Sequence, residues 1–482
     1  MRLMHKTLKQ GGTFVVEPRR LSKASAELRT RGFGEITIPP STETAEKQAS
    51  RCTDCGVPFC QNACPLQNNI PDWLRLSAEN EPREAWRVAS LTSTMPEICG
   101  RICPQDRLCE GNCVIEQSGH GTVTIGAVEK YLTDLAWENG WVLPITPGTE
   151  RAESVGIIGA GPGGLAAADV LRRKGVQVTV YDRYDRAGGL LTYGIPGFKL
   201  EKPVVMQRIE QLEKAGVQFV MNCNVGTDIS FDAIRGQHDA VLIATGVYKA
   251  RDIEAPGVGL SGVVKALDYL TASNRKSFGD EVVEFDNGTL DAKGKRVVVI
   301  GGGDTAMDCV RTAIRQGAVS VKCLYRRDKA NMPGSQREVQ NAEEEGVDFV
   351  WLTAPRGFVG SDHVHGVIVQ KMRLGAPDAS GRQSPEIIEG ADYTEAADLV
   401  IQALGFEPED LTGQWDAPDL AVTRWGTVKA DFRSHATNLP GVYAAGDIVR
   451  GASLVVWAIR DGREAADAIL EYLAQPAQVA AE

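Results

Sequence analysis

The fold of this chain is decided by Glu153-Ser154-Val155-Gly156-Ile157-Ile158-Gly159-Ala160-Gly161-Pro162-Gly163-Gly164-Leu165. This stretch predicts a short apolar strand, a glycine turn and the start of a helix. Gly159, Gly161 and Gly164 form a G-x-G-x-x-G pattern. The first glycine allows a tight turn, the second lets a pyrophosphate approach the backbone, and the third lets helix and strand pack closely. The following helix, over 165–174, would direct its free N–H groups at the phosphates.

An acidic residue follows this turn at the distance that a dinucleotide-binding unit requires. A second strand is expected over 176–181, and it ends in Asp182. A carboxylate about 20 residues after the turn can accept hydrogen bonds from ribose hydroxyls. Strand, turn, helix, strand and acid all occur in order, so the pattern predicts a nucleotide site rather than a plain turn.

Further glycines support a flavin at this first site. Gly188 and Gly189 follow the second strand, where a close backbone approach suits a flat ring system. Residues 239–246 predict a buried strand that ends in a small-residue turn at Gly246. No cysteine pair lies in this region, which argues against a flavin disulfide reductase, because that class needs a redox dithiol.

A second glycine pattern predicts a second nucleotide domain. An apolar strand over 297–300 is followed by Gly301, Gly303, Asp304 and Ala306, with a helix expected over 305–316. The next strand, over 319–325, ends in Arg326 and Arg327, at the corner where the first domain has an acid. Because arginine pairs bidentately with a 2′-phosphate, this domain is predicted to prefer NADP(H) over NAD(H).

The C-terminal part of the chain returns to the first nucleotide domain. Residues 439–447 predict a strand that ends in Gly446 and Asp447, and Asp447 is placed to bond a ribityl hydroxyl of FAD. The helix expected over 453–474 would direct its positive N-terminal end at the flavin. The predicted division is therefore a head over 1–150, an FAD domain over 151–290 and 410–482, and an NADPH domain over 291–409.

Composition limits the partners of the chain. It has 482 residues and a net charge of −11, which argues against a general affinity for nucleic acid or anionic membranes. There is no apolar run of membrane-spanning length and no signal-peptide pattern at residues 1–17. We therefore expect a cytoplasmic protein.

The cysteines are concentrated in the head. Eight of the eleven form two quartets: Cys52, Cys55, Cys60 and Cys64, then Cys99, Cys103, Cys109 and Cys113. In a large chain without a secretion signal, clustered cysteines indicate metal more often than disulfides. The spacing over 70–90 is helical, so the predicted head is a helical domain held together around its cysteines.

Three interpretations of the quartets compete. Zinc fits four cysteines better than eight, and disulfides conflict with the compartment. Iron–sulfur clusters take thiolates from dense runs, often with proline after the last one, and both Cys64 and Cys103 precede proline. We favour two 4Fe-4S clusters with crossed ligation. One is expected to use Cys52, Cys55, Cys60 and Cys113, and the other Cys64, Cys103 and Cys109, with its last ligand open between Cys99 and Glu129.

Taken together, these motifs resemble the small (β) subunits of NADPH-dependent glutamate synthases over nearly the whole chain. The arrangement is also similar to the N-terminal half of dihydropyrimidine dehydrogenase, and to ferredoxin:NADP oxidoreductases of the adrenodoxin-reductase type, which lack the cysteine head. In the dehydrogenase a glutamine completes one cluster. Counting from Cys113, Glu129 stands at that place here, so the resemblance leaves the ligand open.

The resemblance implies a fold and an activity. The fold is α/β, with two Rossmann-like domains, one inserted in the other, preceded by an α-helical iron–sulfur domain. The activity is oxidation of NADPH at FAD, with electrons passed through the clusters to a large (α) subunit in a hetero-oligomer. That partner would convert L-glutamine and 2-oxoglutarate into L-glutamate. The alternative is the same electron transfer to a different partner, for pyrimidine or ferredoxin reduction.

Overall fold

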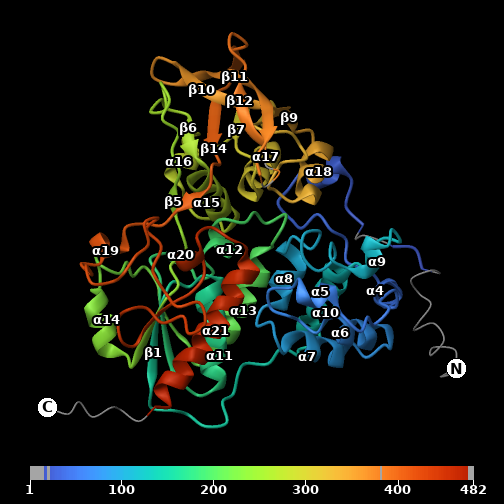
Figure 1. Cartoon of the computed structure of the whole chain (residues 1–482), viewed down its shortest axis with the longest axis vertical. Helices are drawn as coiled ribbons and strands as arrows, with labels where there is room; N and C mark the ends of the chain where they lie inside the picture. Colours follow the sequence, from blue (N-terminus) through green and yellow to red (C-terminus); the bar gives the residue numbers. More distant parts are fainter. Residues whose placement is uncertain (1–15, 19–21, 380, 382, 476–482) are drawn as a thin grey trace.

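The computed structural model describes residues 16–18, 22–379, 381 and 383–475. Residues 1–15 and 476–482 lie outside these ranges. They are the ends of the first and last expected domains, and the first of them is most of the stretch expected to contain no signal peptide. The described chain forms a helical head and two bodies built on parallel sheets (Figure 1). No helix in these ranges combines the length and the apolar character needed to cross a membrane.

The head is helical, as its spacing predicts. Its elements are α3 (Ala26–Arg29), α4 (Thr42–Ala49), α5 (Phe59–Asn62), α6 (Ile70–Ala78), α7 (Pro82–Ser90), α8 (Pro96–Ile102), α9 (Val114–Gln117) and α10 (Ile125–Glu138). The segment over 70–90 is two helices, because Asn80 takes a left-handed conformation (φ 59°) and Pro82 begins α7. Trp73 of α6 and Leu132 of α10 are fully buried in the hydrophobic core of the head.

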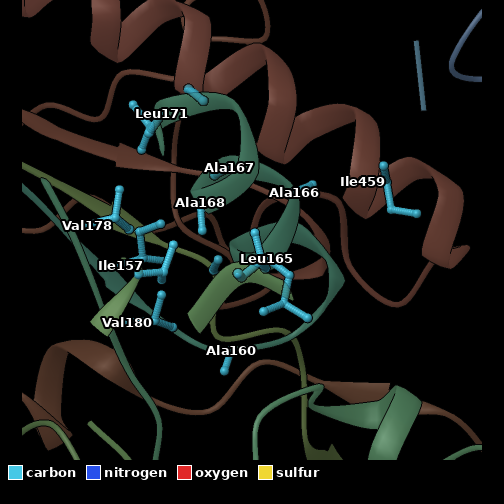
Figure 2. Close-up of a cluster of buried hydrophobic side chains, with 14 of the residues drawn as sticks. Ile157, Ala160, Leu165, Ala166, Ala167, Ala168, Leu171, Val178, Val180 and Ile459 are labelled. Atoms are coloured by element: carbon cyan, nitrogen blue, oxygen red, sulfur yellow. The ribbon is translucent and has the colours of Figure 1, made fainter. Parts of the chain in front are cut away.

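The first sheet is parallel, with the order β16-β4-β1-β2-β3. Its strands are β1 (Ser154–Ile158), β2 (Gln177–Tyr181), β3 (Gln218–Val220), β4 (Ala240–Ile243) and β16 (Val442–Ala444). Its helices are α11 (Pro162–Arg173), α12 (Leu190–Tyr193), α13 (Lys202–Lys214), α14 (Phe231–Gln237), α19 (Leu411–Gln414), α20 (Asp447–Arg450) and α21 (Val455–Leu473). Figure 2 shows Ile157, Val178 and Val180 of the sheet against Leu165 and Ala168 of α11. The C-terminal strand and helix thus complete the first domain.

The second sheet repeats this plan, with the order β6-β14-β7-β8-β9. Its strands are β6 (Val263–Lys265), β7 (Arg296–Ile300), β8 (Ser320–Tyr325), β9 (Asp348–Trp351) and β14 (Leu399–Gln402). Its helices are α15 (Ala266–Ser277), α16 (Val283–Asp286), α17 (Asp304–Gln316) and α18 (Gln336–Glu344). An antiparallel sheet adds β10 (Thr353–Gly360), β11 (Val364–Pro377), β12 (Gln383–Ile387) and β13 (Tyr393–Ala396).

The border between the two sheet domains differs from the expected one at residue 290. The expected border puts residues 263–277 in the first domain, yet β6 pairs with β14 and α15 packs with α17 in the second. The inserted domain therefore starts before β6. The chain enters and leaves it through β5 (Lys249–Ala250) and β15 (Phe406–Glu407), which pair antiparallel. The predicted fold class, with one Rossmann-like domain inserted in the other, is confirmed.

Candidate functional site

The first glycine turn is shaped by backbone contacts that only glycine permits. Gly159 has a φ of 112°, and a Cβ there would lie 2.3 Å from the carbonyl oxygen of Ala244. A Cβ on Gly164 would lie 2.0 Å from the oxygen of Gly159. Gly161, in contrast, has no heavy atom within 4 Å of an added Cβ. The turn is therefore closed on its strand side and open at Gly161, where a pyrophosphate would approach.

Asp182 connects this turn to the end of β2. Its carboxylate accepts hydrogen bonds from the backbone N–H of Ala160 (2.7 Å) and of Tyr184 (2.9 Å). Burial raises the pKa of Asp182, although both hydrogen bonds favour its charged form. The residue lines a cavity with Thr245, whose buried hydroxyl has no hydrogen-bond partner among the described residues. Thr245 could not be singled out from the sequence, because a lone threonine before Gly246 carries no motif.

The glycines after β2 pack directly on the first turn. Gly188 donates its N–H to the oxygen of Ala160 (2.8 Å), and a Cβ on Gly189 would lie 2.9 Å from the Cα of Gly161. Gly246, with a φ of 71°, ends the turn after β4. These glycines let the turn after β1, the segment after β2 and the turn after β4 come close together at one edge of the first sheet.

Asp447 lies at the start of α20 with an unpaired oxygen. Burial raises its pKa to about 6, while hydrogen bonds from Ser453 lower it. Its Oδ1 is buried and has no hydrogen-bond partner within the described part of the chain. Gly446, with a φ of 78°, turns the chain to place it there. A buried carboxylate oxygen that still lacks a hydrogen-bond donor can accept a hydrogen bond from a ligand hydroxyl group.

The second glycine turn has the same construction as the first. Gly301 has a φ of 146°, and a Cβ there would lie 2.2 Å from the oxygen of Ala403. Ala306 is fully buried, and Gly303 has open space where a side chain would be. Asp304 begins α17 and accepts a hydrogen bond from the N–H of Ser335 (2.9 Å).

The two arginines lie directly after β8, as Asp182 does after β2. Arg326 is exposed, and the buried Nε of Arg327 has no hydrogen-bond partner among the residues described. The nearby Lys329 and Arg337, in contrast, form ion pairs with Glu343 and Glu110. The free guanidinium groups at the corner fit a 2′-phosphate.

The structure brings together the first expected group of four cysteines. One small pocket, formed by head residues and lying beside Phe59, is lined by Cys52, Cys55, Cys60 and Cys113. Burial raises the pKa of Cys52 to about 11 and that of Cys60 to about 12. Gathered, desolvated thiols of this kind are stabilised as thiolates when a cation binds them.

A second group surrounds Cys103 on the inner side of the head. Cys103 hydrogen-bonds to Cys99, which raises its pKa, and burial raises it further. Burial also raises the pKa of Cys64 (to about 11) and of Cys109, with an additional contribution from Glu129 in both cases. Burial raises the pKa of Glu129 itself to about 8. The charge of Glu129 therefore raises the pKa of Cys64, Cys103 and Cys109, whereas Cys99 raises that of Cys64 and Cys103.

The spacing of the sulfur atoms separates zinc from an iron–sulfur cluster. Over the described residues, the three potential ligands whose atoms all lie within 4.8 Å of one another are His435, Asp461 and Glu464, and the cysteines form no such group. Four thiolates around one zinc ion would lie about 3.8 Å apart, given the Zn–S bond length. The quartets are more open, which fits a cluster better than a single ion.

Parts of all three domains meet at one cavity of about 480 Å³. The head contributes Cys103 and Pro104, the first domain Leu190 and Val455, and the second domain Asp304, among others. The cavity thus brings Cys103 close to Leu190 and Val455 of the first domain and to the start of α17 in the second. A buried pair missed from the sequence, Lys199 with Asp308 (2.8 Å), also lines it.

Comparisons with known proteins agree with this division. A family model described as dihydropyrimidine dehydrogenase domain II, 4Fe-4S cluster, matches residues 29–141, and one described as pyridine nucleotide-disulphide oxidoreductase matches residues 153–462. The small chain of NADPH-type glutamate synthase from Azospirillum brasilense is 63% identical over 95% of this chain and 96% of its own. The one from Halomonas elongata is 47% identical over 94% and 95%.

A solved structure shares the fold of the two sheet domains. Mycobacterium tuberculosis FprA in complex with NADPH matches with a TM-score of 0.57 and 21% identity, over 67% of this chain and 85% of that one.

Proposed function

Because the chain belongs to the family of small chains of NADPH-dependent glutamate synthases, we propose that it is the electron-input subunit of such an enzyme. It oxidises NADPH and passes the electrons through two 4Fe-4S clusters to a large subunit, which makes L-glutamate from L-glutamine and 2-oxoglutarate. FAD, when bound, supplies the step from a two-electron hydride to single electrons. The chain's own residues bind and orient the reactants, and no side chain is assigned a proton-transfer role.

One observation carries this proposal. The cavity lined by Cys103, Leu190, Val455 and Asp304 belongs at once to the head and to both sheet domains. An electron carrier needs a metal group, a flavin and a nicotinamide within reach of one another, and a cavity that brings Cys103 of the head against both sheet domains supports such an arrangement.

The first domain is proposed to hold FAD. Gly159, Gly161 and Gly164 present the open turn and the N-terminus of α11 to the pyrophosphate, and Gly188, Gly189, Gly246 and Gly446 permit the close chain approaches around it. Asp182 and Thr245, which line one cavity, are proposed to bind the adenosine part of FAD. Asp447 accepts a ribityl hydroxyl with its unpaired oxygen.

The second domain is proposed to hold NADPH. Gly301, Gly303 and Ala306 form the phosphate turn at the start of α17, and Asp304 is part of that turn. Arg326 and Arg327 bind the 2′-phosphate, which is the group that distinguishes NADPH from NADH.

The head is proposed to hold the clusters with crossed ligation. Cys52, Cys55, Cys60 and Cys113 bind one, and Cys64, Cys103 and Cys109 bind the other. For the open position we favour Glu129 over Cys99, because the Glu129 carboxyl acts on all three of those thiols.

Iron content separates the two candidates for the open position. In the complex with the large subunit, Glu129→Ala should lose the iron of one cluster, whereas Cys99→Ser should keep both. Cys103→Ser is the positive control for cluster loss. Iron lost from Cys99→Ser and retained in Glu129→Ala would assign the position to Cys99 instead.

The proposed activity is tested with the chain by itself and with its partner. Loaded with FAD, the chain should reduce an artificial acceptor with NADPH, and glutamate should form only after the large subunit is added. Co-purification from the native source identifies that partner. If the chain is isolated with a pyrimidine-reducing or ferredoxin-binding protein instead, the same electron transfer serves a different reaction.

A further inference from the structure

The phosphate turn of the second domain is covered by a segment of its own domain, residues 331–335. Gly334 donates its N–H to the oxygen of Gly302 (3.0 Å), and Ser335 donates to Asp304 Oδ1 (2.9 Å). A Cβ on Gly334 would lie 3.1 Å from the oxygen of Gly302, so the two segments are in close contact. The covering segment therefore forms one wall of the site in which the pyrophosphate of NADPH would lie.

The iron–sulfur head reaches this wall through the loop between Cys103 and Cys109. Arg107 donates from Nη1 to the oxygen of Pro333 (2.6 Å), and its Nη2 lies 3.4 Å from Asp304 Oδ2. The neighbouring Asp106 accepts a hydrogen bond from Ser335 Oγ (3.3 Å). A loop that holds cluster ligands thus touches both the covering segment and the first residue of α17.

Charge explains why an arginine is needed at this contact. The N-terminus of α17 favours an anion, but the carboxylate of Asp304 at the same place repels the pyrophosphate. Among the described residues, Arg107 forms the ion pair with Asp304, and the nearby Lys199 is engaged with Asp308. The Arg107 side chain is 42% exposed, so part of its guanidinium still faces outward.

We propose that Arg107, supplied by the iron–sulfur domain, is a binding residue of the NADPH pyrophosphate site. It neutralises Asp304 and directs N–H groups at the phosphates, while it holds the covering segment through Pro333. This inference rests on the proposed binding of NADPH to the second domain. It means that the head, besides carrying electrons, completes the substrate site of the domain that it faces.

The test compares two ligands on the protein purified with FAD and iron bound. NADP⁺ contains the pyrophosphate, whereas adenosine 2′-monophosphate carries only the 2′-phosphate that Arg326 and Arg327 would bind. Arg107→Ala should weaken NADP⁺ binding at least about tenfold, as expected for one lost charge-assisted hydrogen bond. It should leave the dissociation constant of adenosine 2′-monophosphate and the iron content at their wild-type values.

Two further variants separate charge from domain docking. Adding Asp304→Asn to Arg107→Ala should restore much of the NADP⁺ affinity, because the repelling carboxylate is gone. Arg337→Ala is the matched control. Arg337 also joins the two domains, through Gln105 (2.7 Å) and Glu110 (2.9 Å), but makes no ion pair with Asp304. Its loss should leave NADP⁺ affinity within about twofold of wild type, because Arg337 does not pair with Asp304.

Any of three binding results would overturn the inference. Arg107→Ala could bind NADP⁺ as tightly as the wild type, it could bind NADP⁺ and adenosine 2′-monophosphate more weakly by the same factor, or Arg337→Ala could weaken NADP⁺ binding as much as Arg107→Ala does. Iron lost from Arg107→Ala would also overturn it, because the residue would then serve the cluster loop. A wild-type protein that binds neither ligand would instead defeat the proposed NADPH site itself.

Discussion

The two sheet domains use opposite charges at one equivalent residue position. Asp182 follows β2 of the first sheet, and Arg326 and Arg327 follow β8 of the second. A carboxylate at this corner accepts ribose hydroxyls and repels an added phosphate, whereas a guanidinium pairs with that phosphate. We propose that the residue at the end of one strand decides which dinucleotide each domain selects.

The arginine pair leads to the first prediction. Arg326→Ala combined with Arg327→Ala should raise the KM for NADPH about tenfold to a hundredfold, because charge-assisted hydrogen bonds to the 2′-phosphate are lost. The KM for NADH should change little. Steady-state kinetics with an artificial acceptor measure both values, and equal increases for the two nucleotides would defeat the assignment.

The unpaired oxygen of Asp447 predicts a pH dependence. Burial raises the pKa of this carboxyl to about 6, so it is protonated below that pH and ionised above it. The charged form accepts a ligand hydroxyl more strongly, so FAD affinity should fall as pH drops through about 6. Asp447→Asn should bind FAD more weakly near neutral pH and lose this dependence. If the FAD affinity of Asp447→Asn changed with pH in the same way as that of the wild type, the titrating group would be a different residue.

At the scale of elements, helices α11 and α21 meet through a pair of glycines. A Cβ on Gly462 of α21 would lie 2.0 Å from the carbonyl oxygen of Gly163 in α11. Because the N-terminus of α11 lies at the first glycine turn, the C-terminal helix helps to hold that turn in position. No spacing rule in the sequence reveals this contact, since the two glycines are far apart in the chain.

This contact gives a stability prediction. Gly462→Ala should lower the free energy of unfolding by about 1–3 kcal/mol, since the added methyl group forces the two backbones apart. FAD should also dissociate more readily. The matched control is Gly236→Ala in α14, where an added Cβ meets no atom within 4 Å. Thermal unfolding that is unchanged by Gly462→Ala would mean that the helices adjust without cost.

The elements were largely predictable, and their partners were less so. The β-branched runs before each glycine turn fixed β1 and β7, and the crossed grouping of Cys113 with Cys52 and Cys60 agrees with the pocket that they line. Strand β6 was not predictable, because three residues carry little periodicity and their partner β14 is far along the chain. The roles of Thr245 and Arg107 depend on tertiary contacts that no local pattern encodes.

At the scale of the whole molecule, the head packs against both sheet domains (Figure 1). The buried pair of Glu97 with Arg208 (2.7 Å) joins the head to α13, and Arg29 reaches Glu345 (2.9 Å) beside α18. Cys103 lines the shared cavity, whereas a separate pocket beside the half-exposed Phe59 is lined by Cys52, Cys55, Cys60 and Cys113. This arrangement puts Cys103 on the side of the head that faces the two sheet domains.

The central claim is that electrons from NADPH leave this chain through its cysteine-bound iron. The most direct measurement compares NADPH oxidation and glutamate formation by wild type and Cys103→Ser, each in complex with the large subunit. We predict that Cys103→Ser still reduces an artificial acceptor with NADPH but forms no glutamate. Glutamate formation at the wild-type rate by a variant that lacks the iron of that cluster would contradict the account.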